Sequence, residues 1–203
     1  MSLKIIQLKD LIETRTSEDL ATLLHSFHAL VVKNQSQVHD VETFLHKKAV
    51  EFEKLDLART YLVLSTYKNK PFLAGYFSIS NKPLTIPRKT FQRFSTSLKK
   101  RLMGVGHKTD QQSYEIRGYL LGQLGKNYNE ETIQSEMISG ADLLTLACEK
   151  IEEAQRLVGG RIIYIECDDH PKLIEFYQQH GFRLLEDHHT ANQQVIMVRR
   201  FER

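Results

Sequence analysis

Hydrophobic residues in the first quarter of the chain recur at the spacing of an amphipathic α-helix. Within Leu20–Val31 they return every three or four residues, and a second series with the same spacing runs through Val41–Leu55. Ser17 and Asp40 precede the two series as candidate N-cap residues, because their side-chain oxygens can accept hydrogen bonds from the free N–H groups of a first helical turn. The pattern predicts two neighbouring helices and a helical N-terminal part of about residues 1–58.

The hydrophobic pattern then changes to that of β-strands. Thr60–Thr66 and Phe72–Ser80 are rich in β-branched, aromatic and aliphatic residues, and Tyr67–Pro71 between them carries turn residues. These three segments predict an antiparallel hairpin. Helical spacing returns in Pro87–Lys100, since proline is tolerated at a helix start.

The second half of the chain predicts alternating strands and helices. Ser113–Gly125 has the composition of a strand that contains glycines, Ile138–Val158 has the clearest helical pattern, and Arg161–Cys167 is a second strand. A short helix over Pro171–His180 and a strand over Val195–Arg200 follow. The strand–helix–strand passage is short enough for a parallel pair joined by a right-handed crossover, which is typical of an α/β fold.

Composition narrows the classes further. The 203 residues contain no internal repeat and no linker-like stretch, which predicts a single domain over residues 1–203. No run of about eighteen apolar residues occurs and no signal-peptide core is present, so we expect a cytoplasmic protein outside the membrane. Cys148 and Cys167 are too few for a disulfide framework. Neither they nor the nine histidines have metal-site spacing, so we expect no metal.

One junction between a strand and a helix has the chemistry of an anion site. Ser135, Ser139 and Gly140 lie where the Ile138–Val158 helix begins, and a helix N-terminus offers free N–H groups and the positive end of a dipole. Glycine lets a ligand approach the backbone closely, and serine adds a hydroxyl donor. On their own, however, a serine and a glycine at a helix start more often serve as ordinary helix caps.

Four segments occur in the order found in the GNAT superfamily of acetyl-CoA-dependent N-acetyltransferases. They are QLGKNY at 123–128, SGADLL at 139–144, RIIYIEC at 161–167 and FYQQHGF at 176–182, and AGYFS at 74–78 is similar to the strand that precedes the family's cofactor strand. The resemblance covers about residues 60–200. It implies a central mixed β-sheet flanked by helices, with extra N-terminal helices, and a cofactor-binding part of about residues 113–182. The sheet is expected to splay open between Gly118–Gly125 and Arg161–Cys167 to admit acetyl-CoA.

The resemblance also implies which residues contact acetyl-CoA. In the family a bulged strand presents backbone groups to the pantetheine arm, and a Q/R-x-x-G-x-G/A loop binds the pyrophosphate. The loop aligns here in two frames, from Gln134 to Ser139 or from Ser135 to Gly140, and both lack the central glycine. The expected contacts are Leu124, Gly125, Lys126, Ser135, Ile138, Ser139, Gly140 and Phe176.

Tyr177 is the candidate catalytic residue. The family's tyrosine at this place protonates the departing CoA thiolate after an amine attacks the thioester, and a phenol can donate that proton. The alternative is that Tyr177 packs in the core and its hydroxyl reaches a protein partner. Glu115 and Glu166 are candidate general bases, with surface salt bridges as the alternative for both. Cys167 lies in a buried strand and is expected to be an apolar filler, not a nucleophile.

A basic segment, Arg88–Arg101, stands out in a chain whose net charge is only +3. It interleaves six basic residues with Phe91 and Phe94, which fits either a solvated amphipathic helix or a patch that contacts RNA phosphates. The basic segment follows Gly75-Tyr76-Phe77 and precedes the expected cofactor strand. This order is similar to that of GNAT toxins that acetylate the amino acid on charged tRNA.

The leading expectation is direct acetyl transfer from acetyl-CoA to a primary amine. A tRNA-acetylating toxin and a non-catalytic module that binds CoA or a protein are the alternatives. The sequence leaves open whether the N-terminal helices cover the acceptor groove or form a homodimer, and whether an antitoxin partner exists.

Overall fold

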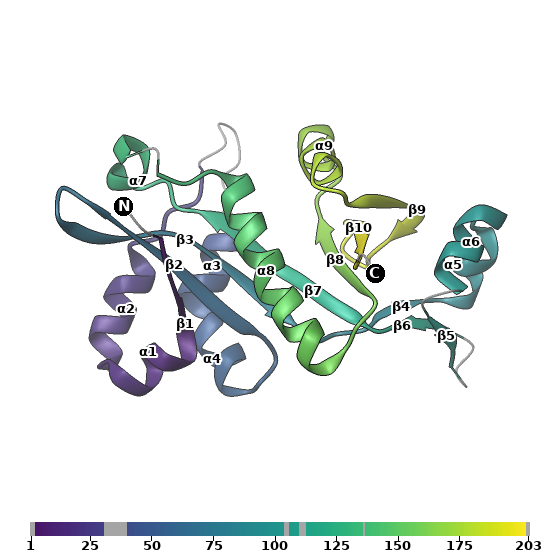
Figure 1. Ribbon diagram of the computed structural model, residues 1–203, viewed down its shortest axis with the longest axis horizontal. Helices are drawn as coiled ribbons and strands as arrows, with labels where there is room; N and C mark the ends of the chain where they lie inside the picture. The colour runs from purple at the N-terminus through teal and green to yellow at the C-terminus, as the bar shows by residue number, and fades with distance from the viewer. Residues whose placement is uncertain (1–2, 31–39, 104–105, 110–112, 136, 202–203) are drawn as a thin grey trace. The chain divides into compact units, whose positions relative to one another are not determined.

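A computed structural model describes residues 3–30, 40–103, 106–109, 113–135 and 137–201. Its contacts divide the chain into two compact units (Figure 1). Unit 1 comprises Met1–Ser80 and Gln123–Ala147, and unit 2 comprises Asn81–Gly122 and Cys148–Arg203. Strand β7 (Gly118–Lys126) and helix α8 (Gly140–Val158) each contribute to both units.

A seven-stranded sheet has the order β1-β2-β3-β7-β8-β10-β9. Parallel pairing joins β7 to β8 (Ile162–Cys167), whereas antiparallel pairing joins β1 to β2, β2 to β3, β8 to β10 and β10 to β9. The predicted mixed sheet with flanking helices is therefore confirmed. The β7–β8 register runs from Gly118↔Ile162 to Leu120↔Tyr164, after which β7 continues to Lys126.

Unit 1 contains the predicted hairpin, formed by β2 (Arg59–Tyr67) and β3 (Lys70–Ser80). Lys68 and Asn69 close it with positive φ angles of 48° and 62°, the backbone that a tight hairpin turn requires. A strand that the helical N-terminal prediction missed, β1 (Lys4–Gln7), pairs with β2 along the opposite edge. Its four residues are too few to carry a periodic pattern, so long-range pairing decides its structure.

Four short helices complete the N-terminal part: α1 (Leu8–Thr14), α2 (Ser17–His25), α3 (Asp40–Lys47) and α4 (Ala49–Lys54). The N-cap of α2 is Thr16, whose hydroxyl accepts from the Asp19 amide at 3.1 Å, and not Ser17 as the sequence predicts. Helix α2 also ends at His25, earlier than the pattern indicates, and part of the predicted Leu20–Val31 series lies outside the described residues.

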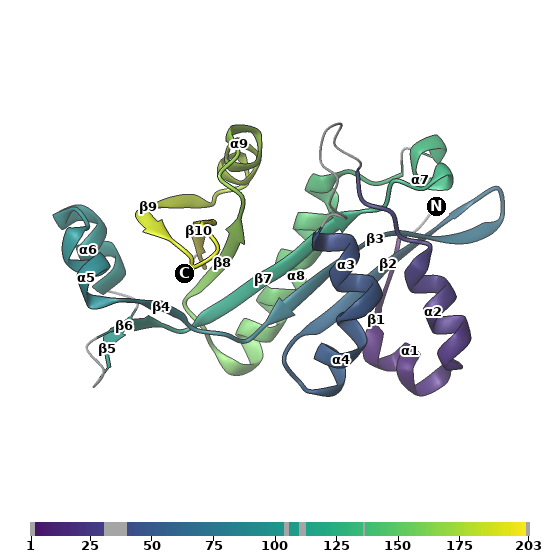
Figure 2. The same ribbon diagram turned by 180° about the vertical axis from the view of Figure 1, so that it is seen from behind.

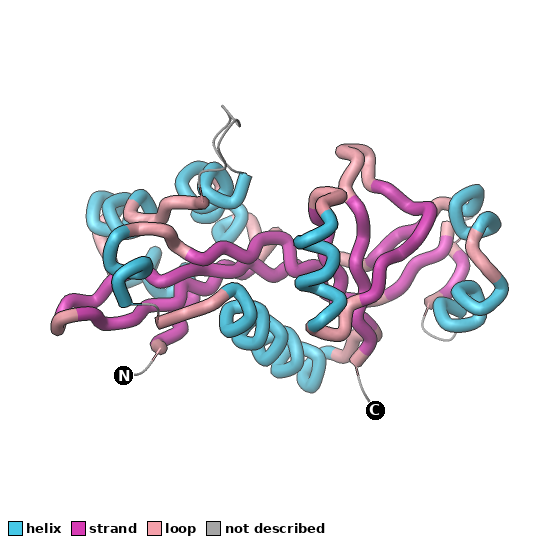
Figure 3. Tube along the Cα trace, turned by 90° about the horizontal axis from the view of Figure 1, so that it is seen from above, coloured by secondary structure: helices cyan, strands magenta, loops and turns pink. Residues whose placement is uncertain are grey.

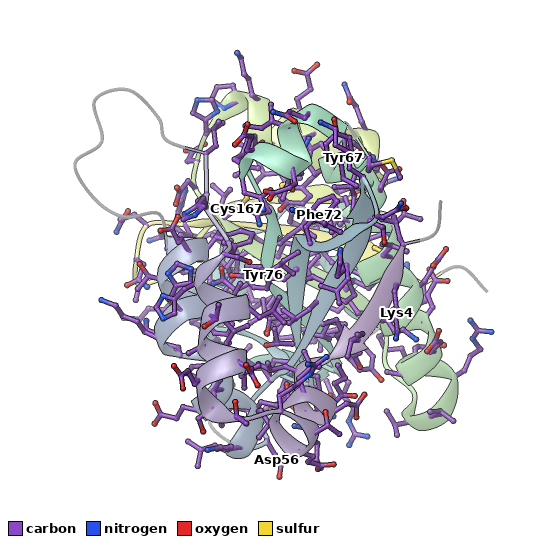
Figure 4. All side chains as sticks on the ribbon, turned by 90° about the vertical axis from the view of Figure 1, so that its left-hand side faces the viewer. Lys4, Asp56, Tyr67, Phe72, Tyr76 and Cys167 are labelled. Atoms are coloured by element: carbon purple, nitrogen blue, oxygen red, sulfur yellow. The ribbon has the colours of Figure 1, made fainter. Side chains whose placement is uncertain are left out.

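The helices of unit 1 lie on both faces of its strands. Figure 1 shows α8 in front of β3, and Figure 2 shows α3 and α4 in front of the strands from behind. Figure 3 shows the same layers from above, with cyan helices on either side of the magenta strands. Consecutive residues of β3 face the two layers: a Cβ at Gly75 would meet Leu143 of α8, whereas the Tyr76 hydroxyl donates to the Val41 carbonyl of α3 (Figure 4).

Unit 2 contains a second, three-stranded sheet in the order β4-β6-β5, formed by β4 (Leu84–Ile86), β6 (Tyr114–Ile116) and β5 (His107–Lys108). The predicted Ser113–Gly125 strand is therefore wrong as one element, because the chain leaves β6 at Arg117 and enters β7 at Gly118. A Cβ at Gly118 would lie 2.7 Å from the Ile162 carbonyl oxygen, so only glycine permits this close pairing with β8.

The predicted Pro87–Lys100 helix is two helices, α5 (Arg88–Arg93) and α6 (Thr96–Met103). Phe94 between them has an extended backbone, and the Ser95 hydroxyl accepts from the Leu98 amide at 3.2 Å to begin the second helix. The break places Phe94 in the core and lets Phe91 stack on Tyr114 with ring centroids 4.4 Å apart. Core packing thus overrides a continuous helical pattern.

The remaining elements of unit 2 follow the predicted order. After α8 and β8 come α9 (Pro171–Gln179), β9 (Arg183–His189) and β10 (Val195–Arg200). Gly181, at a φ of 82°, makes the turn after α9, where only glycine is unstrained. His188 and His189 lie at the end of β9. No helix in the described ranges is long and apolar enough to cross a membrane.

Candidate active site

Tyr177 lies on α9 with only 6% of its surface exposed. Its ring packs edge-on against Phe176 and Phe182, with centroids 5.1 and 5.8 Å away. Burial raises the pKa of the phenol above its ordinary value of 10, and the nearby Cys167 and Cys148 raise it further. The hydroxyl therefore keeps its proton at neutral pH, as a general acid must.

The Tyr177 hydroxyl differs from the other buried tyrosine hydroxyls of the chain. Four of those donate to a backbone carbonyl: Tyr76 to Val41, Tyr114 to Leu102 (2.6 Å), Tyr119 to Gly159 (2.6 Å) and Tyr164 to Pro83 (3.5 Å). Within the described ranges the Tyr177 hydroxyl has no hydrogen-bond partner. In the described ranges Ser65 Oγ is the one fully buried side-chain oxygen without a partner, so the Tyr177 hydroxyl is not a sealed, unsatisfied group, and packing of its ring in the core remains compatible with it.

Two buried cysteines accompany Tyr177. Cys148 of α8 and Cys167 of β8 (labelled in Figure 4) are both free thiols. Burial raises the pKa of Cys167 to about 11, with Asp168 and Asp169 adding to the effect, and burial also raises the pKa of Cys148. Since the thiolate is the nucleophilic form, both side chains are suited to packing and not to covalent catalysis.

The N-terminus of α8 is closed by a reciprocal pair of side-chain contacts. The Ser139 hydroxyl accepts from the Asp142 amide at 3.1 Å, and the Asp142 carboxylate accepts from the Ser139 amide at 2.8 Å. These hydrogen bonds lower the pKa of Asp142, to which the Lys126 ammonium contributes. The amides of Gly140 and Ala141 have no acceptor among the described residues, so an anion can still bind at this end of the 19-residue helix.

The sequence-predicted contact residues fall into both units. Leu124, Gly125, Lys126, Ser135, Ile138, Ser139 and Gly140 lie in unit 1, whereas Phe176 and Tyr177 lie in unit 2. The hydrogen bonds from Ser139 and, to a smaller extent, the charge of Lys126 lower the pKa of Asp142. The Ser135 hydroxyl donates to the Thr132 carbonyl of α7 (Glu130–Ser135), and the Ile138 side chain is buried. The alignment of the pyrophosphate loop includes Glu136, which lies outside the described residues.

Gly125 has a packing reason for being glycine. A Cβ at this position would lie 2.5 Å from Val41, 2.8 Å from Phe27 and 3.2 Å from Tyr76. The strand end that carries the expected pantetheine contacts is therefore pressed against α3 and the segment after α2. The sequence suggested a contact with a ligand, whereas these neighbours explain the glycine without one.

Both candidate general bases lie within 4.0 Å of a basic side chain. The Glu166 carboxylate lies 3.9 Å from the Lys82 ammonium, and the Glu115 carboxylate lies 4.0 Å from the His107 ring. Glu115 belongs to β6 of the three-stranded sheet, so its expected place on the cofactor strand is wrong. Both contacts fit the salt-bridge alternative.

Glu166 also lies on the other face of β8 from the tyrosine. Successive side chains of a strand point to opposite faces, and Cys167, the next residue, is the one that lies near Tyr177. A carboxylate on the opposite face is poorly placed to accept a proton from an amine that reacts beside Tyr177.

Asn127, which sequence reasoning missed, holds the expected cofactor strand in place. Its side chain is fully buried and donates to the Leu73 and Ser26 carbonyls at 2.7 and 3.0 Å. Its carbonyl oxygen accepts from the amides of His28 and Asn129 at 2.9 and 3.1 Å. The one sequence signal is a polar residue directly after a predicted strand.

The basic segment Arg88–Arg101 presents its charges outward. Arg88, Lys89, Arg93 and Lys100 are exposed on α5 and α6, while Phe94 is buried. Lys99 is partly buried and donates to the Gln92 carbonyl at 2.7 Å. The segment is therefore an amphipathic cover of unit 2 with a charged outer face, an arrangement that serves both alternatives from the sequence.

No group of three or more His, Cys, Asp or Glu side chains within the described ranges could hold a metal ion.

Comparison with known proteins identifies the fold. No protein-family model matches the sequence, and no curated protein matches it. A crystal structure of a tyrosine-to-phenylalanine variant of KacT is similar over 98% of this chain and 95% of its own, with a TM-score of 0.61 and 16% identity. A structure of AtaTR bound with acetyl-CoA is similar over 98% and 92%, with a TM-score of 0.58 and 18% identity.

AtaT complexed with acetyl-methionyl-tRNAfMet is similar over 97% of this chain and 94% of its own, with a TM-score of 0.61 and 19% identity. These neighbours are GNAT-fold toxin acetyltransferases, and the chain has the same GNAT-like α/β fold.

Proposed function

We propose that the protein is an N-acetyltransferase that moves the acetyl group of acetyl-CoA to a primary amine by direct attack. The observation that carries the proposal is the protonated Tyr177 hydroxyl, which has no described hydrogen-bond partner and is not sealed in the core. The amine nitrogen bonds to the acetyl carbon as the C–S bond breaks, and the Tyr177 hydroxyl gives its proton to the leaving sulfur, so CoA departs as a thiol. The proton that the attacking nitrogen loses passes to solvent, and solvent restores the proton of the phenolate. The GNAT-like fold supports the same assignment, since neighbours of this fold include a complex with acetyl-CoA.

The α8 N-terminus is the proposed site of the pyrophosphate. The amides of Gly140 and Ala141 and the Lys126 ammonium favour the anion, whereas the Asp142 carboxylate opposes it. The residues present thus fit a phosphate group with one unfavourable charge beside it. The remaining predicted contacts, Leu124, Gly125 and Phe176, stay proposals.

For the acceptor, we propose the aminoacyl end of a charged tRNA. AtaT, one of the similar structures, is complexed with acetyl-methionyl-tRNAfMet, and the exposed cations of α5 and α6 suit RNA phosphates. The α-amino group of an aminoacyl ester is a primary amine, so the proposed chemistry at Tyr177 needs no change.

The test is transfer of a radiolabelled acetyl group from acetyl-CoA to a pool of charged tRNAs, with free amino acids as the competing acceptor class. We expect label on the aminoacyl-tRNA. Tyr177→Phe keeps the ring but removes the proton donor, so transfer should fall by about 10²–10⁴-fold, in kcat more than in KM. Tyr164→Phe removes another buried hydroxyl and should leave the rate within about twofold of the unmodified protein.

The outcomes separate the candidate functions. Label on free amines alone would support an acetyltransferase but contradict aminoacyl-tRNA as its acceptor. Binding of acetyl-CoA without transfer to any acceptor would favour a non-catalytic module. Full activity of a folded Tyr177→Phe variant would show that solvent protonates the sulfur.

A further inference from the structure

Unit 2 contains a cavity of about 880 Å³ that the proposed transfer chemistry does not use. Residues from α6, α8, β8, β9 and β10 line it, and all of them belong to unit 2. Its volume lies within the roughly 300–1,000 Å³ that is usual for small-molecule sites. We call it the arginine cavity because Arg156, Arg183, Arg199 and Arg200 contribute to its wall.

The charges of the arginine cavity are unbalanced. Glu152 is its one carboxylate among the described lining residues, and it accepts from Arg199 at 3.0 Å. Arg156 donates through Nε to the Glu152 carbonyl at 3.3 Å. Among the side chains that the structure describes, which leave out those of Glu186 and Asp187, no carboxylate pairs with Arg183 or Arg200. Their guanidinium groups are therefore available to an anion, and their planar donors suit phosphate.

The strand register places Arg183 and Arg200 on one face of the sheet. Arg183 is paired directly with Val198 of β10, and Arg200 is paired with Ile162 of β8. Directly paired residues share a face, and residues two apart on a strand share it too, so the partly buried Val198 forms an apolar floor next to both arginines. Ile162, across from Arg200, shares this face but is fully buried.

Helix α6 supplies an apolar wall above this floor. Leu98 and Leu102 line the cavity, and Leu102 packs in the same core cluster as Ile162. Arg199 also lines the cavity, but because it is one residue from Val198 its side chain leaves β10 on the other face, where its guanidinium lies 5.5 Å from the Phe182 ring. The floor and the wall together offer a flat apolar group a place beside two arginine side chains.

We propose that the arginine cavity binds a phosphorylated nucleotide, with the phosphates on Arg183 and Arg200 and the base against the apolar surface of Val198 and Leu98. The nucleotide is either free or one unit of an RNA strand. Only the RNA source rests on the proposed aminoacyl-tRNA acceptor, because the cavity geometry itself is independent of the transfer reaction.

The test measures binding of two probes, ATP and a short 5′-phosphorylated single-stranded RNA, by calorimetry at low salt. Saturating acetyl-CoA is present throughout so that the probes do not report on the cofactor site. We expect micromolar or tighter binding of at least one probe. Arg183→Glu and Arg200→Glu should each weaken it by about tenfold or more, since each removes a charge-assisted contact and adds a repulsive charge.

Arg161→Glu is the matched control, because Arg161 is exposed in the same unit but does not line the cavity. It should change binding by about twofold or less. Equal losses of probe affinity in all three variants would show that general surface charge, and not the cavity, binds the probe, which would overturn the proposal. Binding of neither probe would overturn it too. If a Glu variant fails to fold, Arg183→Gln and Arg200→Gln repeat the comparison without charge reversal.

Binding of RNA without ATP would assign the cavity to an RNA strand, and binding of ATP would assign it to a free nucleotide. Acetyl-CoA binding is measured in the same proteins by thermal shift, and the two arginine variants should keep it. If the unmodified protein binds a probe but not acetyl-CoA, the proposed acetyltransferase function is contradicted and the nucleotide site is retained. Loss of acetyl-CoA binding in both arginine variants would show that the cavity is part of the cofactor site, and this would overturn the proposal.

Discussion

Two buried polar side chains, Asn127 and Tyr177, have opposite hydrogen-bonding states. Both amide protons and the carbonyl oxygen of Asn127 are used, and its partners come from β3, the end of α2 and the chain just beyond β7. Fully satisfied buried polar groups are typical of structural roles. The Tyr177 hydroxyl has no such partner in the described ranges and is not sealed in the core, so it is free for the proposed chemical role.

Asn127→Ala should lower the free energy of unfolding by about 2–4 kcal/mol, because it leaves buried carbonyl and amide groups without partners. Asn129→Ala is the matched control: its carbonyl oxygen accepts only from Thr132, so the loss should be about 1 kcal/mol. Chemical denaturation of both variants measures the difference. Equal losses would mean that Asn127 is not the tie between these segments.

The raised pKa of Tyr177 predicts a pH profile. A phenol whose pKa lies above 10 in the folded protein stays protonated at every pH below that value, so the acid form is present from neutral pH to pH 10. We expect kcat/KM for acetyl transfer to show no loss from this group up to pH 10. A profile that falls with an apparent pKa well below 10, and loses that fall in Tyr177→Phe, would contradict the burial argument.

At the scale of the element, the N-terminus of α8 serves stability and the proposed binding of phosphate with different residues. The Ser139–Asp142 pair caps the helix, while the Gly140 and Ala141 amides are the ones left for a ligand. Substitutions here should therefore move helix stability and cofactor affinity independently.

Gly140→Glu places a side chain and a negative charge at the proposed pyrophosphate site. Acetyl-CoA at about 100 times its Kd should stabilise the unmodified protein by about 2.7 kcal/mol, and this variant should show no such stabilisation. Asp142→Asn removes the unfavourable carboxylate and should tighten acetyl-CoA binding by about two- to fivefold. Thermal-shift titrations measure both. An unchanged response in Gly140→Glu would place the site elsewhere.

At the scale of the whole molecule, the net charge of +3 conceals a local concentration of cations on α5 and α6. Their apolar residues pack into unit 2, so the charges are held on a folded surface and not on a free tail. A fixed set of cations that contacts RNA releases a fixed number of counter-ions, which makes the affinity fall with salt.

Replacing Lys89, Arg93 and Lys100 with Ala should flatten the dependence of log Kd on log salt concentration for tRNA by about one unit per lost phosphate contact. The control replaces Lys47, Lys48 and Lys54, three exposed lysines of unit 1, and changes the net charge equally. Filter binding over a salt series gives both slopes. The same slope in both triple variants, or no tRNA binding at low salt, would remove this surface from RNA recognition.

Local sequence was sufficient where one element carries its own pattern. The β2–β3 hairpin has two long strand-like runs around a turn, α8 has five turns of hydrophobic spacing, and the short helix expected over Pro171–His180 is α9. Core packing of Tyr177 was the alternative that the sequence offered, and its ring is buried. Periodicity and turn chemistry are properties of residues close in sequence, so they can be recognised without knowing which other segments an element packs against.

Tertiary structure decided what depends on residues far apart in the chain. Strand β1 forms through its pairing with β2. The predicted strand is interrupted at Arg117 because β6 before it and β7 after it belong to different sheets. Helices α5 and α6 are separate, and Phe94 between them is buried. The missing partner of the Tyr177 hydroxyl and the pairing that sets Arg183 beside Arg200 are likewise invisible in sequence. Each is an interaction between distant segments, and neither hydrophobic period nor composition encodes which segments meet.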